Sequence, residues 1–162
     1  MEVKNFEERL EENNKIVKKY TWYSIGAGII PVPFVDLAAL SGVQLKMLWD
    51  LSAQYNIEFS QNKAQNIIST LAGTLAASAT STVVGSVIKF VPVIGTILGT
   101  ISMPAFSGAS TYALGKVFIQ HFESGGTFLT FDPMKVKEHY ADLFKEGQKI
   151  VEKMQEEKNS KK

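Results

Sequence analysis

Few residues in this sequence have the types and spacing that chemistry at an active site requires. His121 and His139 lie well apart and outside any H-E-x-x-H context, so we interpret both as surface or packing residues. The chain has no G-x-S-x-G motif, no Walker A loop and no cluster of metal ligands. It also has no cysteine, which excludes thiolate chemistry. We therefore predict a protein that is not an enzyme, with no catalytic residue, cofactor, metal or small-molecule substrate.

One polar set stands out within the apolar stretch 33–54, where Asp36, Gln44 and Lys46 interrupt the hydrophobic residues. Asp36 would lie in the first turn of a helix, where the positive end of the helix dipole favours a carboxylate. A buried carboxylate bonded to another helix, or a group that binds a partner, is the alternative for Asp36. Lys46 and Asp50 are four residues apart, the spacing of an ion pair along one helix.

Helical periodicity dominates the chain, and no stretch requires a strand. We predict an all-α single domain over residues 1–162, with an amphipathic N-terminal helix in 1–19, an apolar helical core in 20–125 and an amphipathic C-terminal helix in 132–157. Helices are expected from Val3 to before Pro31 and over 33–54, 61–89, part of 93–101, 102–122 and 132–157. Ser102 and Asp132 are expected N-caps, and Gly125 and Gly126 should supply left-handed conformations where a helix ends.

Charge is balanced overall but strongly segregated along the chain. Lys and Arg total 17 against 16 Asp and Glu, so net charge gives no reason to expect a nucleic-acid partner. Residues 64–88 and 90–115 carry no charge, and Asp36 is the only charge from Tyr20 to Leu45. Both ends of the chain, by contrast, alternate Lys and Glu densely.

Small residues recur every fourth position in the uncharged middle. The first row is Ser69, Gly73, Ala77, Ser81 and Gly85, and the second is Gly95, Gly99, Ser107, Thr111 and Gly115, interrupted by Met103. Such rows form a groove across a helix surface, in which another helix can approach closely. We predict a helical bundle built around a self-packing hairpin of small residues over 64–118.

The environment of that hairpin is open to two interpretations. In the first, it is embedded in a membrane, because a helix over 64–88 would rise about 37 Å at ~1.5 Å per residue and exceed a hydrocarbon core of ~30 Å. Lysines at both ends would then place both termini on the cytoplasmic side of a bacterial inner membrane. Trp22, Tyr23 and Trp49 would mark interfacial positions or pack in a core. In the second, the uncharged middle is the core of a soluble bundle.

The element P-x-P-x-x-D-x(7)-Q-x-x-M, formed by Pro31, Pro33, Asp36, Gln44 and Met47, resembles the YcjF-like bacterial family of unknown function. The resemblance extends over about residues 12–150. It implies a membrane-associated helical module that occurs alone or behind an Era-like GTPase domain. This chain has no GTPase domain, so the resemblance implies a GTPase only as a separate partner, and it supplies no catalytic residues.

Three functional interpretations follow. The first is a non-enzymatic, membrane-associated protein that anchors or regulates a partner, either a GTPase or a second copy of itself, with the lipid bilayer as a further partner. The second is a soluble helical interaction domain. The third is a pore-forming or membrane-remodelling protein that inserts after synthesis in a soluble form.

Overall fold

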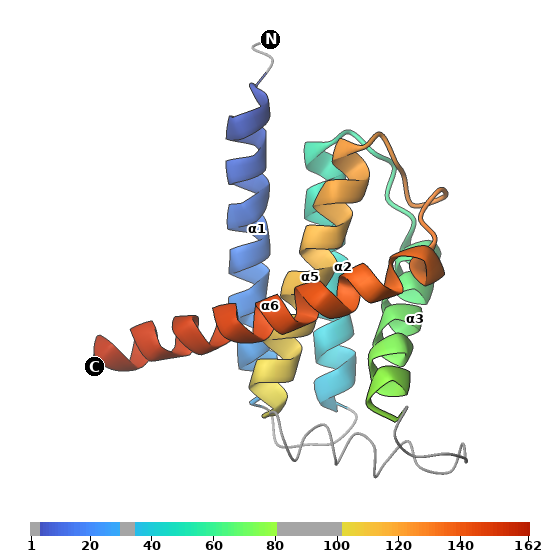
Figure 1. The fold of residues 1–162 in the computed structure, drawn as a ribbon. Helices are drawn as coiled ribbons and strands as arrows, with labels where there is room; N and C mark the ends of the chain where they lie inside the picture. The colour runs from blue at the N-terminus through green and yellow to red at the C-terminus, as the bar shows by residue number, and fades with distance from the viewer. Residues whose placement is uncertain (1–3, 30–34, 81–101) are drawn as a thin grey trace.

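Helices make up most of the computed structural model, which describes residues 4–29, 35–80 and 102–162. These ranges contain no strand, which confirms the all-α prediction for them. The helices are α1 (Phe6–Ala27), α2 (Val35–Gln54), α3 (Gln61–Thr80), α5 (Met103–Glu123) and α6 (Pro133–Ser160) (Figure 1).

Local capping explains where three of these helices begin. The Ser102 hydroxyl accepts a hydrogen bond from the Ala105 amide, and the Asp132 carboxylate accepts one from the Met134 amide. Both N-caps confirm predictions. The cap of α1 is Asn5, so this helix begins later than Val3, where it was expected. After α5, Gly125 has a φ of 84°, the left-handed conformation that was predicted, but Gly126 does not.

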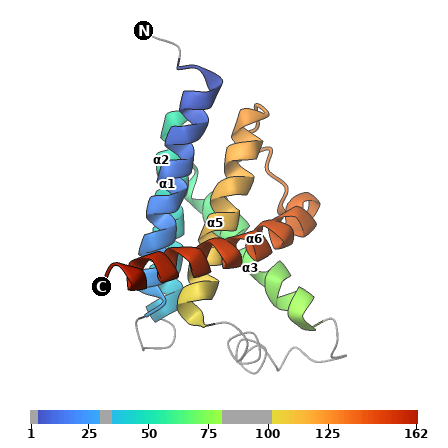
Figure 2. The same ribbon diagram turned by 60° about the vertical axis from the view of Figure 1, so that its left-hand side comes forward.

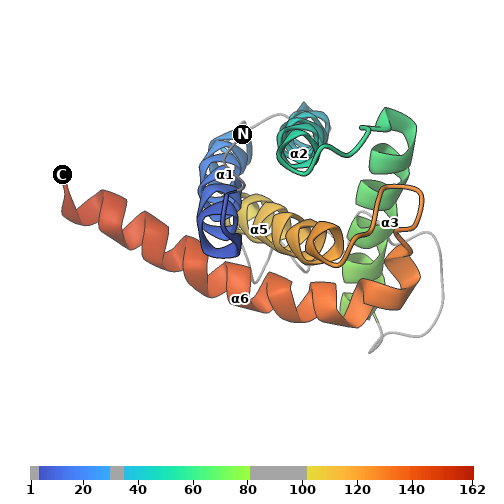
Figure 3. The ribbon, with the colours of Figure 1, turned by 90° about the horizontal axis from the view of Figure 1, so that it is seen from above.

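Helix α5 lies at the centre of the bundle. It packs against α6, α1 and α2, whereas α3 packs against α6 and α2 (Figure 3). Helix α6 crosses the other helices transversely, as the view of Figure 2 shows. The predicted pairing of the segments 64–88 and 93–118 in one hairpin is therefore wrong for their described parts, since α3 and α5 are not among the closely packed helix pairs.

Glycines permit close helix contacts on two sides of α5. A Cβ atom on Gly115 would lie 2.5 Å from Val17 Cγ2 of α1, and one on Gly147 of α6 would lie 2.9 Å from the Ala109 carbonyl oxygen. These distances are shorter than van der Waals contact, so a side chain at either position would push two helices apart. The described part of the second small-residue row, Ser107, Thr111 and Gly115, does form a groove in α5, and this groove faces α1.

An aromatic cluster joins the loop between α2 and α3, and the loop between α5 and α6, to helix α5. Phe118 stacks on Phe131 with ring centroids 4.5 Å apart, and Phe122 and Phe128 lie against it at 5.4 Å each. Phe59, from the loop after α2, meets the Phe128 ring edge-on. The loop between α5 and α6 is thereby anchored to the core, with Phe118 and Phe128 almost fully buried.

A membrane span needs a long helix that is apolar throughout, and no helix among the described residues meets that requirement. The predicted membrane hairpin includes residues 81–101, which lie outside the described part of the chain.

Candidate functional site

The first row of small residues does not form a packed groove where the structure describes it. Ser69 and Gly73 are exposed on α3, and a Cβ on Gly73 would meet no atom within 4 Å. Ala77 belongs to α3, but its surroundings lie outside the described part, as do Ser81, Gly85, Gly95 and Gly99. Of the predicted packing residues, Gly115 is the one that neighbouring helices approach closely in the described structure, through Val17 of α1 and Met47 of α2.

The residues of the family-like element separate into two groups. Pro31 and Pro33 lie outside the described residues, and Asp36 belongs to α2 without a described side chain. Gln44 and Met47 are buried on the face of α2 that meets α5. Both interpretations of Asp36 therefore stay predictions, whereas Gln44 and Met47 have defined packing roles.

Gln44 belongs to a buried cluster of hydroxyl groups that joins three helices. Its Nε2 donates to Thr111 Oγ1 at 3.1 Å and to Ser110 Oγ at 3.2 Å. Thr111 Oγ1 also shares a hydrogen bond of 2.6 Å with Ser24 Oγ of α1. Buried polar groups are costly unless bonded, so this cluster favours one register of α1 and α2 on α5. Ser107, one turn before, has a buried hydroxyl without a hydrogen-bond partner in the structure.

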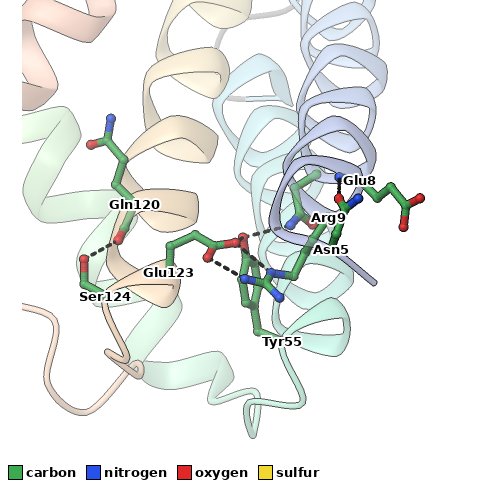
Figure 4. Close-up of polar contacts among 8 residues, drawn as sticks. Asn5, Glu8, Arg9, Tyr55, Gln120, Glu123 and Ser124 are labelled. Carbon is green, nitrogen blue, oxygen red and sulfur yellow. Dashed lines mark hydrogen bonds and ion pairs between the residues drawn. The ribbon is translucent and has the colours of Figure 1, made fainter. Parts of the chain in front are cut away.

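A second polar cluster ties the beginning of α1 to the ends of α2 and α5 (Figure 4). Arg9 makes two parallel hydrogen bonds with Glu123, Nε to Oε1 at 2.9 Å and Nη2 to Oε2 at 2.8 Å. The Tyr55 hydroxyl donates to Glu123 Oε1 at 2.7 Å and accepts from Asn13 Nδ2 at 2.8 Å. Sequence reasoning missed this cluster because its members are far apart in the chain and form no motif.

The hydrogen bonds from Arg9, ahead of the one from Tyr55, hold the pKa of the Glu123 carboxyl below its usual range, although burial acts in the opposite direction. Burial, followed by the bond to Glu123, raises the pKa of the Tyr55 hydroxyl. The cluster is thus an ion pair whose Glu123 carboxylate also accepts from Tyr55, whereas the buried Asn13 Oδ1 has no hydrogen-bond partner in the structure. These contacts hold the beginning of α1 against the ends of α2 and α5.

We expect Glu123 to make folding stability depend on pH in the acidic range. A carboxyl whose pKa is lower in the folded protein stabilises it above the unfolded pKa, about 4.3 for Glu. That contribution is lost as the pH falls through the lower folded pKa. Thermal melts from neutral to acidic pH should show a lower Tm for Glu123→Gln at pH 7 and a shallower decline of Tm below about pH 4.3 than in the wild type.

The matched control is Glu11→Gln. Glu11 also has a lowered pKa, caused by the hydrogen bond from Lys15, but both side chains of this pair are about two-thirds exposed. Exposed pairs contribute little to stability, so the Tm profile of Glu11→Gln should follow the wild type. An unchanged acidic decline in Glu123→Gln would contradict the assignment to Glu123.

A third polar group is centred on Asp50 and confirms one prediction. Lys46 Nζ lies 2.6 Å from Asp50 Oδ1, as their spacing indicated. The Tyr20 hydroxyl donates to the other carboxylate oxygen, and Lys19 Nζ is 3.6 Å from it. Asp50 thereby fixes the height of α1 relative to α2.

The two histidines have protein partners. His121 Nε2 is 2.8 Å from the Thr127 carbonyl oxygen, and His139 Nε2 is 2.6 Å from Gln120 Oε1. Within the described ranges no group of three or more His, Asp or Glu side chains could hold a metal ion. Both histidines therefore make structural contacts near the junction of α5 and α6.

The sequence of the whole bundle matches a known family model, whose description is domain of unknown function (DUF697), over residues 2–156. The chain belongs to the DUF697 family. This DUF697 chain is also similar to magnetosome membrane protein 22 of Magnetospirillum gryphiswaldense, with 33% identity over 146 residues, which are 90% of this chain and 75% of that protein. No solved structure matches the chain.

These similarities define which predictions about the DUF697 chain have support. Membership of an uncharacterised family agrees with the resemblance seen in the sequence, and one relative carries the name of a membrane protein. The closer link to YcjF-like proteins, and with it the association with a GTPase, stays a prediction.

Proposed function

We propose that this DUF697 protein is a non-enzymatic helical module that associates with a lipid bilayer and holds or regulates a partner protein there. The observation that carries the proposal is the 33% identity to a magnetosome membrane protein over most of both chains. The charge distribution supports it, because large parts of α1, α2, α3 and α5 carry no charged side chain, and charged side chains are costly to place in lipid. Hydrogen bonding of the buried hydroxyl cluster to amide and backbone groups also favours a structural role over catalysis.

The location and the partner belong to the same proposal. Lysines are abundant before Tyr20 and after Asp132, and a positive bias of this kind favours the cytoplasmic side of a bacterial inner membrane for both termini. The partner is a GTPase on another chain, as the family resemblance implies, or a second copy of the protein. A photo-crosslinker placed in cells at Glu7, an exposed position on α1, should yield an adduct with one of these. Cells that yield no protein adduct would contradict the partner role.

Vesicle flotation tests the association with lipid directly. The full chain is mixed with vesicles of phosphatidylcholine alone, or of phosphatidylcholine with phosphatidylglycerol, and centrifuged through a density gradient. We expect the protein to rise with the vesicles, and more completely when they contain the anionic lipid, because basic side chains are attracted to an anionic surface. A protein that stays at the bottom with both compositions would overturn the proposal. Leakage of an entrapped dye would instead support the pore-forming interpretation.

A further inference from the structure

Charged side chains form a stripe along the outer side of α1. Glu8, Glu11, Lys15 and Lys18 follow one another at spacings of three, four and three residues, and all four are exposed. At about 100° per residue these positions lie within about 80° of arc on the helix surface, and Trp22 continues the same stripe. The charged stripe is therefore a surface of α1 that no described helix covers before α6 crosses at Trp22.

Local interactions explain only part of the charged stripe. Glu11 and Lys15 pair within the helix, with Oε1 and Nζ 2.8 Å apart. The positive end of the helix dipole favours acidic residues in the first turn, but it does not account for lysines in the middle of α1, whose last turn has no basic residue. Among the described residues, the Glu8 carboxylate and the Lys18 ammonium group have no hydrogen bond or ion pair. Two charges of the stripe thus lack a partner in the described part of the chain.

The charged stripe is complementary to itself when it is read in the opposite direction. Glu8 and Lys18 are equally distant from position 13, and so are Glu11 and Lys15. If two copies of α1 lie antiparallel about a two-fold axis at this position, Glu8 faces Lys18 of the second copy and Glu11 faces Lys15. The two-fold axis repeats each contact, so the stripe gives four pairs of opposite charge and no pair of like charge.

Other arrangements of the two stripes bring like charges together. A shift of about one helical turn in one direction would place Lys15 against Lys15 of the second copy, and a shift in the other direction would place Glu11 against Glu11. A parallel two-fold pair would place every charge against its own copy. Because like charges in contact are unfavourable, the stripe favours one orientation and one register.

Helix α6 marks the end of the charged stripe and projects beyond α1 (Figures 1 and 3). Val151 and Met154 pack on Ile25, and Trp22 joins this contact. After Met154 the helix continues to Ser160 without another buried residue. In the antiparallel pair, the beginning of the second α1 reaches the level of Trp22, where the projecting part of α6 would limit its position. This part of α6 carries charges of both signs, so its contribution to the contact is steric.

We propose that two copies of this protein associate antiparallel through the charged stripe of α1, with Glu8 of each copy opposite Lys18 of the other. The proposal rests on the proposed function only in taking a second copy as the partner, and it adds the surface, the orientation and the register. Exposed ion pairs are individually weak and are screened by salt, so the association is reversible and salt-dependent.

Charge reversal at Glu8 and Lys18 tests the pairing in the purified full chain. Sedimentation velocity at low salt should show the wild type in a concentration-dependent equilibrium between monomer and dimer. Lys18→Glu would face Glu8 of the other copy, and Glu8→Lys would face Lys18. Each variant should therefore weaken the association about tenfold or more. Because both positions are exposed, circular dichroism should show the helix content of the wild type.

Mixing the two variants restores complementarity. An equimolar mixture of Lys18→Glu and Glu8→Lys places opposite charges together at both ends of the contact, so a heterodimer should form about as tightly as the wild-type dimer. The double variant Glu8→Lys/Lys18→Glu should dimerise as well. A folding defect in either variant would not be repaired by mixing. Lys63→Glu on α3 and Glu138→Lys on α6 are the matched controls, since they make the same charge changes at exposed positions elsewhere and should leave the association unchanged.

Four results would overturn the proposal: a wild type that stays monomeric at every concentration, reversal variants that dimerise like the wild type, a mixture that stays monomeric, or equal weakening by the controls. An association that is unchanged between about 50 mM and about 500 mM salt would also contradict a contact made of ion pairs. Vesicle flotation separates this outcome from the proposed function. A monomer that floats with vesicles overturns the dimer alone, and a dimer that does not float overturns the association with the bilayer alone.

Discussion

Gly115→Leu should destabilise the protein by about 3 kcal/mol or more, whereas Gly73→Leu should change its stability by less than about 1 kcal/mol. Both glycines lie within helices of the uncharged middle of the chain. At Gly115 an added side chain would meet Val17 Cγ2 at 2.5 Å and Met47 Sδ at 3.2 Å. Val17 is β-branched and buried, so it cannot rotate away, and α1 would have to move. At Gly73, by contrast, an added Cβ would have no atom within 4 Å.

Urea unfolding monitored by circular dichroism provides the measurement, with the midpoint and slope compared among the wild type and the two variants. A large loss of stability in Gly73→Leu would mean that another part of the chain, or another molecule, covers the exposed row of α3. A Gly115→Leu protein as stable as the wild type would contradict the close approach of α1 and α5.

The second large effect is expected at Phe118. Phe118→Ala should cost about 3–5 kcal/mol, because the ring is fully buried and its removal would leave a cavity among Phe122, Phe128 and Phe131. For a domain of this size, where ~1 kcal/mol corresponds to about 2–4 °C, the Tm should fall by roughly 10 °C. Loss of the stack on Phe131 should also weaken the near-ultraviolet dichroism of the aromatic residues.

Phe6→Ala is the control for Phe118→Ala, because Phe6 is 56% exposed at the start of α1. Its Tm should stay within a degree or two of the wild type, since substitutions at exposed sites change stability little. Equal losses at the two positions would show that the aromatic cluster does not hold the α5–α6 loop in place.

Helix positions could be predicted from the sequence because their signals are local. Ser102 and Asp132 lie directly before the helices that they cap, and Pro133 suits a first turn. The ends of α2 and α5 were likewise expected within one or two residues. Gly125 was predicted correctly as left-handed because it follows the last turn of α5.

The packing partners of the helices could not be predicted in the same way. A row of small residues indicates a surface that another helix can approach, but it does not identify that helix. We expected the row that ends in Gly115 to meet the segment 64–88, whereas it holds α1. The sequence did not show which row would be exposed either. Ser69 and Gly73 of α3 have the same spacing as the buried row of α5, but they face outward.

The candidate site was predictable only in part for a similar reason. Gln44 attracted attention because it interrupts an apolar helix, and its amide has two partners in the buried hydroxyl cluster. Arg9 and Glu123 are ordinary in type and 114 positions apart, so nothing in the sequence links them.

The contact between α1 and α5 also has a consequence for the order of folding. Ser24 and Thr111 are 87 positions apart, so their hydrogen bond closes a long loop of chain. Chains whose contacts join distant residues fold more slowly than those with local contacts, because closing such loops has an entropic cost before the contacts form. On a ribosome, α1 emerges before α5 and has to wait for it before it can bury its apolar face. During that interval Val17 and Ile25, which are buried in the folded protein, lack the contacts that α5 provides.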